Sequence, residues 1–444
     1  MPCFQEAPMA PTPDRRMRRV ALASFIGTTV EWYDFYIYAT AASLVFAKLF
    51  FPGHATGTGT LLAFATYAVG SVGRPLGAIV FGHVGDKAGR KLVLTVTLTL
   101  MGLATVLIGV LPSHATIGIW VPILLTFLRL VQSFGVGGEW GGAVLLAVEH
   151  APKKRRMFYG SLPQTSSAVA LMLSTGIFGL LALAGNDALL AWGWRVPFLI
   201  AAPFIAIGLW VRSVEETPEF TEVQRQEATA SVPLAALVGQ HWRPLVLGVG
   251  AVLITISGFY LSSTFMIFYG VDQRLFDESQ MLNGVTFTGL MAIIATPLGG
   301  ILGDRYGARG TMIWATLACA LVSFPMFWLT ETGVVGWMWI GMSLVMVANS
   351  FAYGALSGLL SGWFPAQVRS SGISVAYQVS GVLGSGLAPV VATALYAISN
   401  PAYLWVAVFL AAMSLLSMTC VLGYRGRDHL AEPVTTPMTP ATGR

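Results

Sequence analysis

The chain has 444 residues, of which 55% are hydrophobic and only 10% are charged. Soluble domains carry roughly 25% charged residues, so this composition excludes a protein whose whole surface faces water. Its 25 Lys and Arg exceed its 20 Asp and Glu, but the basic residues stand mostly between apolar runs, which excludes a nucleic-acid-binding surface.

Apolar runs recur along almost the whole chain, and each is long enough to cross a ~30 Å hydrocarbon core at 1.5 Å per residue. In the first half, the predicted helices cover 20–46, 60–82, 92–111, 117–148, 158–184 and 194–212. In the second half, they cover 244–270, 281–302, 311–330, 335–361, 370–397 and 402–423. The predicted fold class is an all-α membrane protein with twelve transmembrane helices.

Lys and Arg predict which side of the membrane each connection faces, because cytoplasmic segments near the membrane carry the basic excess. With the N-terminus in the cytoplasm, 20 of the 25 Lys and Arg fall in cytoplasmic segments. The others are Lys48, Arg74, Arg129, Arg195 and Arg274. We therefore predict a multi-pass protein of the cytoplasmic (inner) membrane with both termini in the cytoplasm.

The same map predicts five segments along the chain. They are a cytoplasmic N-terminal tail over 1–19, a six-helix bundle over 20–212, a cytoplasmic linker over 213–243, a second six-helix bundle over 244–424 and a disordered cytoplasmic tail over 425–444. The last tail is rich in Pro and Thr and has no apolar periodicity. The basic start resembles a signal peptide, but carboxylates interrupt the first apolar run and no small-residue cleavage site follows it. The run is therefore predicted to remain as the first helix.

One short connection occurs in both halves of the sequence. Its residues are Gly82, Asp86, Gly89 and Arg90 between helices two and three, and Asp304, Arg305 and Arg309 between helices eight and nine. Glycines permit a tight turn and close helix approach, while Asp near a helix N-terminus and clustered Arg form charge-assisted bonds between helices. We predict a gating latch at the inner side.

These connections resemble the GxxxD(R/K)xGRR loop motif of the major facilitator superfamily. Three further stretches resemble its metabolite:proton symporter family, which includes shikimate, α-ketoglutarate, citrate and proline/betaine permeases. They are Gly-Thr-Thr-Val-Glu-Trp-Tyr-Asp-Phe-Tyr over 27–36, Arg-Leu-Val-Gln-Ser-Phe-Gly-Val-Gly-Gly-Glu-Trp-Gly-Gly over 129–142, and Trp-Gly-Trp-Arg-Val-Pro-Phe over 192–198. The resemblance implies two pseudo-symmetric six-helix bundles around a central cavity.

Two carboxylates on helix one are candidates for proton coupling. Glu31 and Asp34 are three residues apart and so lie on one face of the helix. A carboxylate near the bilayer centre is costly unless it is neutralised or paired, so one of the two is expected to hold a proton. Asp34 is the first candidate, and a fixed hydrogen-bond network is the alternative for either residue.

Helix four carries a stripe of polar residues at steps of three and four. Arg129, Gln132 and Glu139 belong to this stripe, which is predicted to face the cavity. Arg129 can hold a carboxylate bidentately, either that of a substrate or that of Asp34, and Glu139 is a further proton-coupling or gating candidate. Arg74 on helix two is a second buried cation, with a purely structural bond as its alternative role.

Neutral side chains complete the candidate substrate site, because no charged residue falls clearly inside a helix of the second half. They are Tyr38, Gln164, Tyr260, Asn349, Tyr353, Tyr377 and Gln378. Hydroxyl and amide groups of this kind bind hydroxyls and carbonyls. Ordinary helix packing is the alternative for each.

We predict a secondary active transporter: proton-coupled symport of a small organic acid, shikimate-, α-ketoglutarate- or dicarboxylate-like, by alternating access. The acid is inferred from the two buried arginines. A zwitterionic osmolyte such as proline or betaine is the alternative, because its carriers share the same motifs. An antiporter is a further alternative, although helix five lacks the Gly-Pro-rich pattern of drug:proton antiporters.

Enzyme chemistry is not indicated. The six His form no HxxxH or HExxH pair, the three Cys are scattered, and the Gly-rich stretch over 135–138 lies inside an apolar helix rather than after a strand. We expect no catalytic residue, no metal and no cofactor. The expected partners are a small-molecule substrate, protons and the lipid bilayer, with no nucleic acid, and the protein is expected to act as a monomer.

Overall fold

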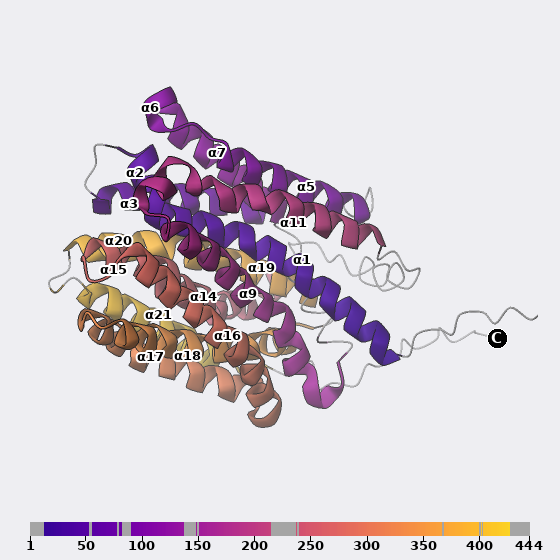
Figure 1. Ribbon diagram of the computed structural model, residues 1–444. Helices are drawn as coiled ribbons and strands as arrows, with labels where there is room; N and C mark the ends of the chain where they lie inside the picture. The colour runs from indigo at the N-terminus through magenta and orange to yellow at the C-terminus, as the bar shows by residue number, and fades with distance from the viewer. Residues whose placement is uncertain are drawn as a thin grey trace, which may run out of the picture.

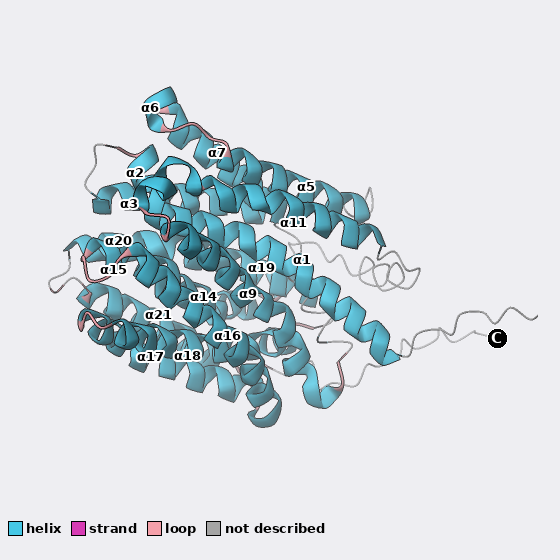
Figure 2. Ribbon diagram, viewed as in Figure 1, coloured by secondary structure: helices cyan, strands magenta, loops and turns pink. Residues whose placement is uncertain are grey.

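The computed structural model describes most of the two predicted bundles. The described residues are 13–52, 56–77, 80–81, 90–136, 148, 151–214, 237, 239–365, 368–398, 401 and 403–426. For residues 13–24, 26, 56, 90–94, 153, 186, 204–205, 207–214 and 370 only the backbone is described. All regular structure in this part of the chain is helical (Figure 2).

The described residues of the first half form six rods, each made of one or more consecutive helical segments. They are α1 (Pro13–Ala41) continued by the π-helical η1 (Ala42–Phe46) and α2 (Ala47–Phe50); α3 (Thr56–Ser71) with a helical stretch over 73–77; α5 (Arg90–Gly109); α6 (His114–Ile117) and α7 (Trp120–Val136); the 3-10 turn η2 (Lys153–Arg155) and α9 (Arg156–Ala182); and α10 (Asn186–Ala188), the π-helical η3 (Leu189–Gly193) and α11 (Arg195–Val214).

The second half forms six more rods among the described residues. They are α14 (Trp242–Tyr260) continued by the π-helical η4 (Leu261–Phe265) and α15 (Met266–Asp272); α16 (Glu278–Tyr306); α17 (Ala308–Glu331); α18 (Val335–Trp363); α19 (Arg369–Gly381) continued by the π-helical η5 (Val382–Leu387) and α20 (Ala388–Ile398); and α21 (Leu404–Gly423). The predicted all-α fold is confirmed. In Figure 1 the α3, α5, α7 and α11 rods group on one side and α16, α17, α18 and α21 on the other.

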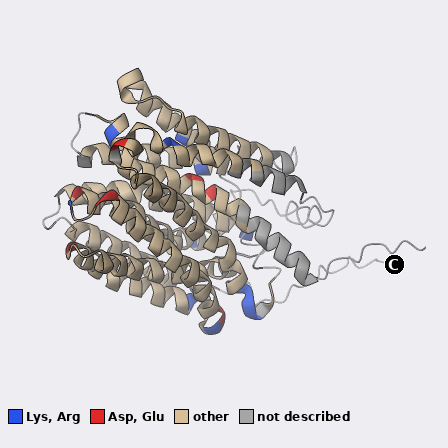
Figure 3. Ribbon diagram, viewed as in Figure 1, with Lys and Arg blue, Asp and Glu red and all other residues tan. Residues whose placement is uncertain are grey.

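Seven helices in the described part are long and apolar enough to span a membrane, and all but the one over 156–182 belong to the second half. Large apolar side chains cover their outward faces: Trp314 is 72% exposed and Leu321 is 68% exposed. Such a surface is stable in contact with lipid rather than water. Charged residues gather mainly at the ends of the rods, with a few segments in the middle of the bundles (Figure 3).

Local sequence sets where α16 begins and ends, beyond the predicted span of 281–302. Asp277 forms a capping box with Gln280, in which the Gln280 N–H donates to Asp277 Oδ1 at 2.7 Å and the Asp277 N–H donates to Gln280 Oε1 at 3.0 Å. At the other end Gly307 has a φ of 86°, a conformation that glycine adopts without strain. This single residue joins α16 to α17 and provides the tight turn that the repeated motif predicts.

The two halves pack against each other along two seams. At the first seam α9 packs on α16, and a Cβ at Gly300 would lie 2.8 Å from the carbonyl oxygen of Met157. At the second seam α3 packs on η5 and α20, and a Cβ at Gly386 would lie 3.1 Å from Ser71 Oγ. Close helix approach at small residues is typical of packing within membranes.

The first rod of each half is interrupted by a five-residue π-helical segment at an equivalent place, η1 in one half and η4 in the other. These segments meet: Ser43 Oγ donates a hydrogen bond to the Thr264 carbonyl oxygen at 3.1 Å. π-Helical segments are frequent at functional sites. They join the halves at the predicted outer end of the protein.

Two predicted segments lie outside or largely outside the described residues. Of the linker over 213–243, the structure describes 213–214, 237 and 239–243; of the tail over 425–444 it describes 425–426. The division of the chain into domains therefore stays a prediction, as does the cytoplasmic position of the termini.

Candidate functional site

A row of hydrogen-bonded side chains crosses the first bundle from α1 to α7. Asp34, which is 0% exposed, accepts a hydrogen bond from Thr105 Oγ1 at 2.9 Å. Thr105 Oγ1 in turn accepts from Gln132 Nε2 at 2.6 Å, and Gln132 Oε1 accepts from Arg129 Nη1. The sequence identified Asp34, Gln132 and Arg129 as candidates, and the structure brings them together through α5.

Asp34 and Arg129 do not form a direct ion pair in this arrangement. The sequence allowed Arg129 to hold the Asp34 carboxylate bidentately, but Thr105 and Gln132 stand between them. Within the part of the chain that the structure describes, Asp34 Oδ1 and the Nε and Nη2 atoms of Arg129 have no hydrogen-bond partner. A buried charge without a direct counter-ion is costly, so each of these groups is available to a proton or to a charged ligand.

Aromatic rings surround the Arg129 guanidinium, which is fully buried. Its Cζ lies 4.5 Å from the ring centroid of Phe35, 4.6 Å from that of Tyr38 and 4.3 Å from that of Tyr67. Gly70 of α3 makes room for this side chain, since a Cβ at that position would lie 2.2 Å from Arg129 Cγ. The rings stabilise a desolvated cation through their negative faces while leaving its N–H edges open to a carboxylate.

Arg74 is the second buried cation, at 2% exposure. Its Cζ lies 3.9 Å from the centroid of the same Phe35 ring, and its Nε and Nη2 atoms have no hydrogen-bond partner among the described residues. Arg74 lines a cavity of about 10 Å³ together with Glu31, and the cavity also touches Gln378 of α19. A carboxylate and a cation thus face one region between the bundles, and Phe35, which also lines it, contacts the second cation, Arg129.

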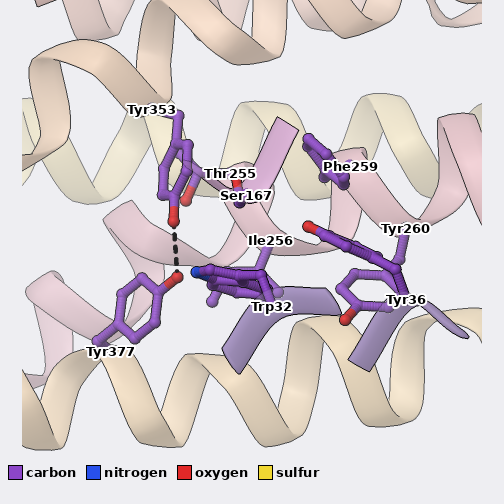
Figure 4. A pocket seen from close by; sticks show the side chains of 9 residues that line it. All are labelled: Trp32, Tyr36, Ser167, Thr255, Ile256, Phe259, Tyr260, Tyr353 and Tyr377. Carbon is purple, nitrogen blue, oxygen red and sulfur yellow. Dashed lines mark hydrogen bonds between the residues drawn. The ribbon is translucent and has the colours of Figure 1, made fainter. Parts of the chain in front are cut away.

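An adjoining cavity lies between the bundles and is lined mainly by rings (Figure 4). Its lining residues are Trp32, Tyr36, Ser167, Thr255, Ile256, Phe259, Tyr260, Tyr353 and Tyr377. Its volume is about 10 Å³, roughly the space of one water molecule. A molecule larger than water does not fit in this ring-lined cavity, called the ring cavity below, unless the bundles move apart.

The neutral candidates differ in how they are placed. Tyr353 and Tyr377 line the ring cavity and share a hydrogen bond of 2.8 Å between their hydroxyls. Tyr260 also lines it and accepts from the Tyr67 hydroxyl at 2.7 Å, which links the two halves. Asn349 is behind this layer and donates from Nδ2 to the Thr255 carbonyl oxygen at 3.1 Å.

Two other neutral candidates do not line the two cavities. Tyr38 shares a hydrogen bond of 2.7 Å with Thr66 and covers Arg129. Gln164 is fully buried in α9, and neither its Oε1 nor its Nε2 has a hydrogen-bond partner in the described ranges. An unpartnered buried amide is costly, which favours contact with water or substrate in another conformation.

The second copy of the repeated motif connects the bundles at the predicted inner end. Asp304 accepts hydrogen bonds from the backbone N–H groups of Met157 at 2.9 Å and Phe158 at 3.0 Å. These are first-turn amides of α9, where a helix end favours a negative charge. Arg309 instead donates to the Leu422 carbonyl oxygen of α21 at 2.9 Å, and Arg305 lies over the ring of its neighbour Tyr306.

Part of the predicted gating and coupling set lies outside the described residues. Gly82, Asp86, Gly89 and Glu139 are in this group, and of Arg90 only the backbone is described, at the start of α5. Their roles remain predictions.

Three contributors to the site were missed by sequence reasoning. Thr105 belongs to a helix with several threonines, and no local signal distinguishes it from the others. Phe35 was quoted within a motif, but its position against both arginines depends on three helices. The ion pair of 2.8 Å between Lys48 Nζ and Glu278 Oε1 joins the bundles at the predicted outer end. Lys48 follows the predicted helix over 20–46 and Glu278 precedes that over 281–302, and neither was a candidate.

Comparison with known proteins identifies the family. The family model described as Major Facilitator Superfamily matches residues 24–377 and, in an overlapping second match, 292–442. The chain is 40% identical over 413 residues to the shikimate transporter of Escherichia coli strain K12, a match that covers 92% of this chain and 94% of that protein. It is 34% identical over 390 residues to the proline/betaine transporter of Salmonella typhimurium strain LT2, covering 85% of this chain and 78% of that one.

A solved structure supports the fold. The crystal structure of a D-xylose-proton symporter superposes with a TM-score of 0.70 at 18% identity and covers 93% of this chain and 98% of that one. At this sequence identity, the similarity supports the fold and nothing further. Taken with the sequence relatives, these likenesses show that the chain is a multi-pass membrane transporter and belongs to the major facilitator superfamily, among its metabolite:proton symporters.

Proposed function

We propose that the protein takes up a small organic acid together with protons across the cytoplasmic membrane. The observation that carries this proposal is the pair of buried arginines, Arg74 and Arg129, whose Nε and Nη2 atoms lack hydrogen-bond partners among the described residues. The Cζ atoms of both are within 4.5 Å of the centroid of one ring, so the two cations lie close to one another. The planar guanidinium matches a carboxylate bidentately.

The row from Asp34 to Arg129 supports a coupling mechanism. The Thr105 hydroxyl lies 2.9 Å from Asp34 Oδ2 and 2.9 Å from the Met101 carbonyl oxygen, but it has one hydrogen. When Asp34 is ionised, that hydrogen goes to the carboxylate. When Asp34 carries a proton, Asp34 donates to Thr105, whose own hydrogen then turns to Met101. The protonation state of Asp34 thus decides which bonds Thr105 makes. Thr105 accepts from Gln132, which in turn binds Arg129, so the change reaches Arg129 through Gln132.

Protonation also changes the charge that a substrate meets. Asp34 is the carboxylate joined to Arg129 through this row. When Asp34 is neutral, Glu31 remains beside Arg74, and two cations with one carboxylate leave a net positive charge. An organic anion then supplies the missing negative charge. Release of the proton restores the Asp34 charge, which weakens the hold of Arg129 on the anion. Proton and substrate therefore bind together and leave together.

Alternating access follows from contacts that close each end of the protein. At the predicted outer end, Lys48 pairs with Glu278 and Ser43 bonds to Thr264. At the predicted inner end, Asp304 caps α9. Both sets join different bundles, so opening to one side requires one set to break. The small volumes of the two cavities support an occluded state.

A zwitterion such as proline or betaine is a second candidate. The ring cavity favours it, because aromatic faces attract a quaternary ammonium group while an arginine takes the carboxylate. The relation to the Salmonella proline/betaine transporter supports the same reading. The relation to the shikimate transporter supports the acid. The site contains two buried cations, Arg74 and Arg129, and one ring-lined cavity that suits a substrate cation. We therefore choose the acid first.

The test is uptake of labelled compounds into proteoliposomes under an imposed inward proton gradient. The compounds are monocarboxylates, dicarboxylates, shikimate, proline and betaine, and a thermal-shift screen with the same set reports binding alone. We expect an organic acid to accumulate and to stabilise the protein. Arg195→Gln serves as the control, since Arg195 lies over Trp194 at a helix end. Accumulation of betaine but of no acid would select the second candidate, and uptake driven by an outward proton gradient would indicate an antiporter.

A further inference from the structure

Phe35 contacts both buried cations. The Cζ atoms of Arg74 and Arg129 lie 3.9 Å and 4.5 Å from the centroid of its ring. Phe35 is 2% exposed and its ring is further fixed by an edge contact with Trp32, at 6.1 Å between centroids. It also lines the cavity that Arg74 and Glu31 share. No other ring among the described residues lies over both guanidinium groups.

We propose that Phe35 is a positioning residue, whose ring holds Arg74 and Arg129 side by side without neutralising them, so that both remain available to one organic anion. This inference rests on the proposed function. It adds a residue that touches no reacting group in the proposed cycle but decides where the two cations stand.

The reason lies in the alternatives open to the two cations. Like charges in a desolvated site repel each other, and an ion pair with a carboxylate would stabilise each guanidinium. Asp34 is next to Phe35 in the chain and Glu31 is one helical turn before it, so both are near. Direct pairing of either arginine with one of these carboxylates would satisfy it and remove it from the substrate. The negative face of a ring attracts a cation without cancelling its charge, and so it competes with this pairing.

The geometry of the two interactions makes them compatible. A ring takes the flat face of a guanidinium, whereas a carboxylate binds its N–H edge. The Nε and Nη2 edges of both arginines are the ones without protein partners. The ring can therefore keep both cations in place before and after an anion binds.

The first test changes the electron density of the ring without changing its shape. Phenylalanine analogues with one, two and three ring fluorines are placed at position 35 by nonsense suppression in the full-length transporter. KM and kcat for uptake are then measured with the organic acid that the uptake screen identifies. Because each fluorine weakens the negative face, we expect KM to rise stepwise, to about tenfold with three fluorines, with kcat and thermal stability changed little. If the ring of Phe35 only fills space, KM should stay unchanged across the series.

The matched control is the same series at Phe50. Phe50 is also fully buried on the first rod and stacks on Phe46 at 4.9 Å, but no guanidinium lies over its ring. We expect no stepwise change there. Equal effects at both positions would overturn the proposal, because they would indicate general packing rather than an interaction with the cations.

A second test needs no substrate. A cryo-electron-microscopy structure of Phe35→Leu in lipid nanodiscs should show Arg74 or Arg129 turned to Asp34 or Glu31. Guanidinium groups that keep their present positions would overturn the proposal even if KM rises. If no organic acid binds the wild-type protein, the proposed function fails, while this structure still decides whether Phe35 positions the arginines.

Discussion

Asp34 and Arg129 are connected through Thr105 and Gln132 and are not paired directly. One hydroxyl and one amide separate a buried carboxylate from a buried cation. A direct ion pair would be self-sufficient, and its two members would have little need of a proton or a substrate. The separation instead leaves each charge dependent on something that arrives from outside. Each element of this row can be tested by a substitution that retains its shape.

Asp34→Asn should abolish accumulation against a gradient while leaving exchange between two loaded sides at least partly intact. Asn retains the shape of Asp but does not titrate, so the proton cannot travel with the substrate. The measurements are net uptake and counterflow of labelled substrate in proteoliposomes. If Asp34→Asn still concentrates substrate and alkalinises the outside medium, Asp34 is structural, and Glu31 or Glu139 has to be examined instead.

Thr105→Val should weaken coupling, and Thr105→Ser should preserve it. Valine has the shape of threonine but no hydroxyl, so the ionised Asp34 loses its donor and Gln132 loses its acceptor. The carboxylate then gives up its proton less readily, and the pH profile of uptake moves to the alkaline side. The profile is measured between pH 5 and 9. A Val variant with the wild-type profile would remove Thr105 from the coupling row.

Arg129→Lys should lower substrate affinity by about tenfold to a hundredfold, which corresponds to the loss of a charged hydrogen bond. The ammonium retains the charge but not the planar fork that binds a carboxylate bidentately. Direct binding is measured by calorimetry in detergent, with Arg195→Lys as the control for a cation away from the cavity. Unchanged affinity in a well-folded Arg129→Lys protein would place the substrate elsewhere.

Asp304→Asn should destabilise closure at the predicted inner end. Asp304 accepts the two α9 amides with its two carboxylate oxygens, whereas Asn has one acceptor oxygen and so retains only one of these bonds. Asn also lacks the charge that favours a helix N-terminus, a difference typically worth about 0.3–1 kcal/mol. Two spin labels on the inner ends of α9 and α16 report the opening by electron-electron distance measurements. We expect a larger open population, whereas Arg309→Gln, whose partner is in the same bundle, should change it less. An unchanged distance distribution would contradict a latch at Asp304.

Both ends of the chain and the 213–243 segment should be cytoplasmic. A single cysteine at position 225, in a protein whose Cys3, Cys319 and Cys420 are replaced by serine or alanine, should be protected from an impermeant reagent in intact cells. The same cysteine should react in inverted vesicles. Labelling from outside in intact cells would reverse the predicted topology.

The sequence predicted the twelve rods well because lipid requires long uninterrupted apolar runs, and such runs are visible without any knowledge of tertiary contacts. Helix ends were less accurate. The capping box of Asp277 and Gln280 starts α16 earlier than hydropathy indicated, and Gly307 lets it run to Tyr306. The charged candidates were also visible, since Asp34 and Arg129 are conspicuous within apolar helices. Their connection was not, because it passes through an ordinary threonine on another helix.

The ion pair of Lys48 and Glu278 shows the same limit. These residues are 230 positions apart in the chain, and each is unremarkable at the end of an apolar run. Only the packing of the two bundles against each other brings them to 2.8 Å. Asp304 was easier to predict, since its motif occurs twice, although the partner it finds, the first turn of α9, is again a tertiary feature.

The glycine-lined seam between α9 and α16 has a mechanical consequence. Gly289, near the midpoint of α16, faces α9, and a Cβ there would lie 3.4 Å from the Ala168 carbonyl oxygen, so no side chain of α16 separates the two rods at this point. α16 has 29 residues and is about 44 Å long, so each of its ends lies about 22 Å from its midpoint. A turn of about 15° about that midpoint displaces each end by about 6 Å, in opposite directions. A small rotation of α16 about the middle of the seam is therefore enough to admit a molecule at one end of the protein while the other end closes.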